Sequence, residues 1–99
     1  MEAWAGRKLK MSSYSKYYIV GRGKRGGMVY YTGRKRYHGS GMNFESDSGW
    51  AIVRSSLERL KHHFIEAITL AKHDGITKLR IMRDTVTSTT KTDKVRDLG

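Results

Sequence analysis

One amphipathic segment, residues 56–74, most constrains how this chain can fold. At about 100° per residue, its apolar side chains fall within a single stripe roughly 100° wide, as in a helix that covers a core. These side chains are Leu57, Leu60, Phe64, Ala67, Ile68 and Ala71. Ser55 and Glu58 have the spacing of a capping box at its start, and Gly75 is a typical stop signal at its end. The pattern predicts one helix that needs an apolar partner surface.

Segments with the composition of β-strands lie on both sides of this helix. Residues 14–20 and 28–32 are rich in Tyr, Ile and Val, and the glycine-rich residues 21–27 between them favour a β-hairpin with a mobile, basic tip. Residues 76–86 alternate between apolar and polar side chains, which is typical of a half-buried strand. The helix can therefore cover one face of a small sheet.

Alternation along the first predicted strand divides its side chains between two faces. Tyr14, Tyr18 and Val20 share one face, whereas Tyr17 and Ile19 share the other. Both faces are partly apolar. One face can therefore pack against the helix while the other keeps aromatic side chains exposed.

Residues 33–49 contain many turn formers and few apolar side chains. They predict a loop, with a short third strand either around Tyr37 or from Met42 to Phe44. Residues 50–53 fit either a further strand or the first turn of the helix. The predicted fold is therefore α+β with the order β-β-(β)-α-β: a small antiparallel sheet with one amphipathic helix packed on one face.

The length of the chain is typical of a single domain, here with two polar ends. Residues 1–12 are expected to form a flexible basic arm, in which Met11 is an alternative start. Residues 13–86 are the predicted α+β domain. Residues 87–99 are expected to be a polar, frayed C-terminal tail.

Composition excludes several classes of protein. The chain has no cysteine, so disulfides and thiolate sites are absent. Its apolar runs are too short to span a membrane, and its first ten residues lack the apolar core of a signal peptide. We expect a cytoplasmic protein, nucleoid-associated if its source is bacterial or phage, with no membrane partner. No cofactor is expected, and no metal, because the H-E-x-x-H spacing is missing.

The basic residues are concentrated in the first half of the chain. The 42 residues between Glu2 and Glu45 contain no acid, but ten Lys or Arg, eight glycines and all six tyrosines. Cations neutralise phosphates and release counterions, while tyrosine rings can stack on bases. High net charge also serves solubility, but solubility does not require one half to lack acids. The distribution therefore predicts a non-enzymatic nucleic-acid-binding protein.

Two basic clusters and several tyrosines are the candidate contacts. The clusters lie at opposite ends of the second predicted strand, about 15–20 Å apart, so both can reach one nucleic-acid backbone. The candidate nucleic-acid-binding residues are Lys16, Tyr17, Arg22, Lys24, Arg25, Tyr31, Arg34, Lys35, Arg36 and Tyr37. Strand tyrosines are often half-buried, so two or three of the five from Tyr17 to Tyr37 should belong to the core. DNA is favoured over RNA, with weak sequence specificity because the cations lie on glycine-rich segments.

Carboxylates on the predicted outer face of the helix argue against a helix that enters the DNA major groove. Glu58, Glu66 and Asp74 would repel phosphates there. The sheet and the loops are therefore the better candidate surface.

Three other interpretations stay open. A compact basic inhibitor or adaptor, of the phage accessory type, would dock on an acidic or nucleic-acid-binding host protein. A small ribonuclease would need an acid–base pair, for which His38 beside Arg36 and Tyr37 is the starting point. A homodimer would form through an exposed strand edge.

No known family is recognised in the chain. Residues 25–31 begin like the RNP1 strand of an RNA-recognition motif, but Gly27 stands where an aromatic is needed and Met28 where a small residue is needed. DNA-binding domains of the AP2 and integrase-arm types have a similar element order, yet share no motif with this sequence.

Overall fold

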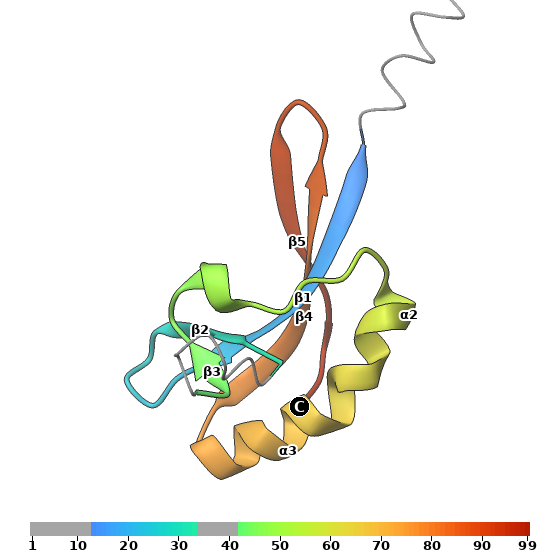
Figure 1. The fold of residues 1–99 in the computed structure, drawn as a ribbon. Helices are drawn as coiled ribbons and strands as arrows, with labels where there is room; N and C mark the ends of the chain where they lie inside the picture. The colour runs from blue at the N-terminus through green and yellow to red at the C-terminus, as the bar shows by residue number, and fades with distance from the viewer. Residues whose placement is uncertain (1–12, 34–41) are drawn as a thin grey trace, which may run out of the picture.

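The computed structural model describes residues 13–33 and 42–99. Within these ranges, a five-stranded antiparallel sheet has the strand order β3-β2-β1-β4-β5, and a helical segment lies between β3 and β4 in the chain (Figure 1). The strands are β1 (Tyr14–Arg22), β2 (Met28–Tyr31), β3 (Phe44–Glu45), β4 (Thr77–Val86) and β5 (Thr90–Asp97). The predicted α+β fold, an antiparallel sheet with one helix on one face, is confirmed.

The helical segment follows the predicted range, residues 56–74, closely. Its consecutive parts are α2 (Leu57–Leu60), the 3-10 turn η3 (Lys61–His63) and α3 (Phe64–Asp74). The N-cap is Ser56 instead of the predicted Ser55, because the Ser56 hydroxyl accepts a hydrogen bond from the Arg59 amide at 3.3 Å. Gly75 ends the helix as predicted, with a φ of 74° that glycine adopts without steric penalty.

The core lies between the helix and the sheet face that the helix covers. Its buried members are Ile19, Tyr31, Phe44, Ile52, Leu60, Phe64, Ala67, Ala71, Leu79 and Ile81. Gly21 of β1 lies at one end of this core, where a Cβ would come within 2.5 Å of Ile76 Cγ2. The link between α3 and β4 therefore approaches the sheet at a position that only glycine fits without rearrangement.

The segment between β2 and the helix contributes little regular structure. The short strand β3 overlaps the predicted alternative at Met42 to Phe44, while the alternative around Tyr37 lies outside the described residues. The 3-10 turn η2 (Ser48–Trp50) follows. Residues 51–53 form neither a strand nor a helical turn, and Arg54 then pairs with Tyr17 through backbone hydrogen bonds of 2.8 and 3.0 Å.

The C-terminal residues 87–99 were predicted as a frayed tail, and that prediction is wrong. They contain strand β5, which pairs with β4 from Thr90 to Asp97. The Leu98 amide then donates to the Leu79 carbonyl at 2.8 Å. Strand formation here depends on backbone pairing with β4 and on the strand propensity of threonine, since few apolar side chains mark the segment.

Strands β1, β4 and β5 continue beyond α2 as a three-stranded arm (Figure 1). The turn between β4 and β5, residues 87–89, lies at its end and is exposed. In the ranges 13–33 and 42–99, no helix is long and apolar enough to cross a membrane.

Candidate nucleic-acid interface

The sheet has a face that is turned away from the helix, which we call the open face. The predicted division of β1 is confirmed: Tyr17 and Ile19 pack on the helix side, and Tyr18 and Val20 belong to the open face. In β2, Tyr30 is paired with Val20 and therefore lies on the open face as well. Two tyrosines from neighbouring strands thus share this surface.

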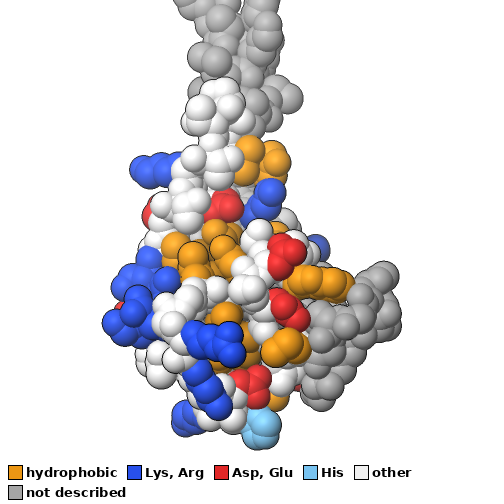
Figure 2. Space-filling view, turned by 90° about the vertical axis from the view of Figure 1, so that its left-hand side faces the viewer, with side chains coloured by type: hydrophobic (Ala, Val, Ile, Leu, Met, Phe, Trp, Pro, Cys, Tyr) orange, Lys and Arg blue, Asp and Glu red, His pale blue; other side chains and the backbone are white. Residues whose placement is uncertain are grey.

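Cross-strand pairing defines the other members of the open face. They are Tyr14, Lys16 and Arg22 of β1, Met28 of β2, Arg80, Met82 and Asp84 of β4, and Thr92 and Lys94 of β5. Figure 2 views the molecule from the side on which β2 and β3 lie in Figure 1. It shows hydrophobic side chains gathered in the middle, with both lysine or arginine side chains and acidic side chains beside them. Such a surface can hold flat rings between cations.

Tyr18 and Tyr30 form the aromatic centre of the open face. Their ring centroids are 6.1 Å apart and the rings are tilted by 35°. The Tyr18 hydroxyl donates to Asp84 Oδ1 at 2.7 Å, and burial together with this carboxylate raises the pKa of the Tyr18 phenol. The phenol therefore keeps its proton and continues to donate at physiological pH.

A recess of about 290 Å³ opens beside these two rings. Its walls include Lys16, Tyr18, Tyr30, Ser48, Val53 and Asp84. Aromatic rings, an ammonium group, a hydroxyl and a carboxylate thus meet in one hollow. This combination provides both a stacking surface and polar groups that can contact the edge of a base.

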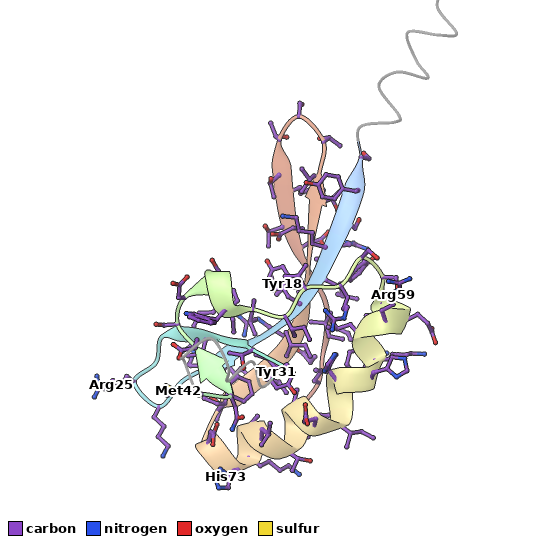
Figure 3. All side chains as sticks on the ribbon, in the orientation of Figure 1. Tyr18, Arg25, Tyr31, Met42, Arg59 and His73 are labelled. Carbon is purple, nitrogen blue, oxygen red and sulfur yellow. The ribbon has the colours of Figure 1, made fainter. Side chains whose placement is uncertain are left out.

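The β1–β2 hairpin ends in a closed turn. The Gly23 amide donates to the Gly27 carbonyl at 2.8 Å, and the Gly26 amide donates to the Gly23 carbonyl at 2.9 Å. Lys24 extends from this turn toward the end of α3, while Figure 3 shows Arg25 projecting away from the molecule. The predicted mobility of the tip stays a prediction.

The cations of the hairpin are not neutralised by the described part of the chain. Arg22, Lys24 and Arg25 form no ion pair with any described carboxylate, and the same holds for Lys16 and Arg80. By contrast, Arg83 is held on the helix-facing side by two hydrogen bonds to Asp93, at 3.2 and 3.1 Å. Unpaired cations also occur elsewhere in the described ranges, namely Arg54, Arg59, Lys72, Lys78, Lys91 and Arg96, while Lys94 of the open face is paired with Asp97 at 3.2 Å. The open face and the hairpin tip therefore contribute five of the described unpaired cations: Lys16, Arg22, Lys24, Arg25 and Arg80.

Two of the predicted tyrosine contacts face the helix instead. Tyr31 is 0% exposed, its ring packs 5.5 Å from that of Phe44, and its hydroxyl donates to Glu66. A fully buried ring cannot stack on a base, so the Tyr31 prediction is wrong. Tyr17 is half-buried against the core and does not belong to the open face. The Tyr31 contact also places Glu66 on the inner side of the helix, and not on its outer face.

The second predicted basic cluster, Arg34, Lys35 and Arg36, lies outside the described residues, as do Tyr37 and His38. Most members of the open face were missing from the predicted set, among them Tyr18, Tyr30, Arg80 and Asp84. Alternation already separated Tyr18 from Ile19, which was a usable signal. The position of Tyr30 depends on the pairing of β2 with β1, which periodicity does not reveal.

A second hollow, of about 730 Å³, lies between the hairpin tip, β3 and the end of α3. Its lining includes Met28, Phe44 and Lys24. Asp74 in the same hollow accepts a hydrogen bond from Asn43 at 3.3 Å and is 2.8 Å from His73 Nδ1. Among the described residues, no group of three His, Asp or Glu side chains is arranged to hold a metal ion.

No protein-family model matches this chain, and it has no match among curated proteins or among solved structures. A functional assignment therefore depends on the residues of the open face and the hairpin tip themselves.

Proposed function

We propose that this protein binds single-stranded nucleic acid, without an enzymatic activity, on the open face and the adjoining hairpin tip. The observation that carries the proposal is the placement of Tyr18 and Tyr30 side by side on a face that also carries Lys16, Arg22 and Arg80, none of which forms an ion pair with a described carboxylate. Bases would stack on the tyrosines while Arg22, Lys24 and Arg25 neutralise phosphates.

A single strand fits this surface better than a duplex. Tyrosine rings stack only on bases whose faces are accessible, and a duplex offers its grooves and phosphates instead. A recess beside the two rings leaves room for an unstacked base. We propose DNA ahead of RNA, with weak sequence preference along most of the strand, because phosphate contacts carry no sequence information. A cytoplasmic, nucleoid-associated location would bring the protein to such a ligand.

Some cations of the protein are held in local ion pairs and are weaker candidates for phosphate contact. On the helix side, Lys61 lies 3.6 Å from Glu58, and Arg83 is paired with Asp93. Local pairs of this kind reduce the attraction of cations for phosphates. On the open face, Lys94 is likewise paired with Asp97 at 3.2 Å. The cations proposed to contact phosphates are therefore Lys16, Arg22, Arg80 and the hairpin-tip residues Lys24 and Arg25.

The test is a titration of labelled single-stranded DNA, duplex DNA and RNA by fluorescence anisotropy at two salt concentrations. We expect the tightest binding to single strands, with an affinity that falls steeply as salt rises. Charge reversal by Arg22→Glu with Arg25→Glu should weaken binding by about tenfold or more and lower the salt slope by about two. Lys24 is left unchanged because its stem packs against Gly75.

The matched control is the double variant Arg59→Glu with Lys61→Glu. It changes the net charge by the same amount as the hairpin variant, but at two exposed residues of the helical segment. This variant should keep most of the affinity. Equal losses in both variants would mean that only net charge matters, and the proposed interface would then be wrong. If no nucleic acid binds even at low salt, the function itself is wrong, and the same cations become a docking surface for an acidic protein.

A further inference from the structure

Asp84 lies in the recess beside Tyr18 and Tyr30 in a fixed orientation. Its Oδ1 atom accepts two hydrogen bonds, one from the Tyr18 hydroxyl at 2.7 Å and one from the Thr92 hydroxyl at 2.8 Å. A carboxylate oxygen has two lone pairs, so both acceptor positions of Oδ1 are occupied. Oδ2 accepts no hydrogen bond from the residues in the two described ranges.

An ionised carboxylate repels phosphates and therefore weakens nucleic-acid binding at this surface. A contact with a base would explain why the carboxylate is placed here. It can accept hydrogen bonds but cannot donate them. The complementary part of a nucleic acid is an exocyclic amino group, which occurs on cytosine, adenine and guanine. Thymine and uracil have only a ring N–H between two carbonyl oxygens, and those oxygens would be repelled by the carboxylate. Recognition of the cytosine amino group by aspartate or glutamate is an established pairing.

Lys16 adds a donor group to the lining of the same recess, with its Nζ atom 6.0 Å from the centroid of the Tyr14 ring. It lies directly across from Asp84 in the pairing of β1 with β4, and both residues line the hollow. The Watson–Crick edge of cytosine has an amino donor next to ring nitrogen and carbonyl acceptors. Asp84 can accept from the amino group while Lys16 donates to the acceptors, with the ring stacked on Tyr18 or Tyr30.

We propose that this recess is a base-selective subsite that binds a base with an exocyclic amino group, and that Asp84 excludes thymine and uracil. The inference rests on the proposed function, since it concerns one base of a bound single strand. Asp84 is the specificity-determining residue. Tyr18 and Thr92 are positioning residues, because they act through the orientation of the carboxylate.

The decisive experiment compares oligo(dC) with oligo(dT) of equal length at neutral pH and one salt concentration. The two bases have rings of the same size, so backbone contacts and stacking are closely matched. We expect wild-type protein to bind oligo(dC) about tenfold more tightly, the effect of one hydrogen bond to a charged group. Asp84→Asn should remove the preference while the affinity for oligo(dT) is retained or increased.

Two further variants separate positioning from folding. Tyr18→Phe keeps the ring but removes one of the two bonds that orient Asp84, so it should reduce the preference for oligo(dC) while oligo(dT) still binds. Asp93→Asn removes a carboxylate from the helix-facing side and should leave the preference unchanged. Binding of oligo(dT) by each variant reports that the surface is intact.

The possible failures are distinguishable. If wild-type protein binds oligo(dC) and oligo(dT) equally, the subsite is wrong and the proposed function stands. If Asp84→Asn keeps the preference, Asp84 is not the specificity-determining residue. If wild-type protein binds neither oligonucleotide at low salt, both the proposed function and this inference are overturned.

Discussion

The side chain of Lys24 lies against Gly75, so that a Cβ at position 75 would come within 2.5 Å of Lys24 Cε. Lys24 belongs to the tip of the β1–β2 hairpin, and Gly75 ends α3. The contact therefore connects the hairpin tip with the C-terminus of the helix. The ammonium group also approaches the end of the helix dipole that attracts cations. The sequence alone suggests that the hairpin tip is an independent loop. In the structure, the tip packs against the end of the helix.

Replacement of Gly75 by alanine should lower the free energy of unfolding by about 1–3 kcal/mol. Alanine would adopt a φ of 74° with a steric penalty, and its Cβ would displace Lys24. Urea denaturation measures the change. Gly26→Ala is the control, because Gly26 also has a positive φ, of 90°, but nothing lies within 4 Å of a Cβ at that position. Equal stability of the two variants would contradict the proposed contact.

Gly21 and Ile76 should be energetically coupled. Gly21→Ala places a Cβ 2.5 Å from Ile76 Cγ2, and overpacking of this kind costs about 1–3 kcal/mol. Ile76→Ala removes the clashing methyl group, so the double variant should be more stable than the sum of the two single changes predicts. A double-mutant cycle by urea denaturation tests this. Strict additivity would show that the two side chains do not compete for space.

Tyr31 and Tyr30 should behave in opposite ways, although they are adjacent in the chain. Tyr31→Phe removes the partly buried hydrogen bond to Glu66 and should lower the free energy of unfolding by about 1–3 kcal/mol. Its affinity for single-stranded DNA should stay unchanged while the protein is folded. Tyr30→Ala should weaken this affinity by removing a stacking ring, worth about 1–3 kcal/mol. Weaker binding by folded Tyr31→Phe would contradict this division.

Stability should fall in mildly acidic solution because of His63. Burial lowers the pKa of His63 below its ordinary value of 6.5, and the nearby Arg54 lowers it further. The unfolded chain therefore takes up this proton at a higher pH than the folded protein does. The stabilisation is complete above the unfolded pKa and is lost as the pH falls from there through the folded pKa.

Urea denaturation at a series of pH values between about 8 and 5 measures this effect. The free energy of unfolding should decline toward acid in the wild type and decline less in His63→Gln. The neighbouring His62 is exposed, so His62→Gln should retain the wild-type decline. If the two variants have the same pH dependence, His63 does not cause the effect.

Periodicity was sufficient to predict the helix, its stop at Gly75 and the two faces of β1. These features are local, because a helical stripe with 3.6 residues per turn and a strand pattern with a period of two residues both depend only on residues that are close in the chain. Periodicity was not sufficient to predict the candidate interface. Tyr30 and Tyr31 have the same side chain, and only the pairing of Val20 with Tyr30 determines which ring is exposed. A shift of one residue would exchange them, because the faces of a strand alternate.

The sequence by itself determined the class of fold, the single helix, and the concentration of cations and tyrosines in the first half of the chain. The tertiary structure decided that β5 forms from a polar segment, because its stability depends on hydrogen bonds to β4 and not on its own apolar pattern. It also decided that Tyr18, Tyr30 and Asp84 meet in one recess. These residues come from three strands, and contacts between distant segments arise only from strand order and register.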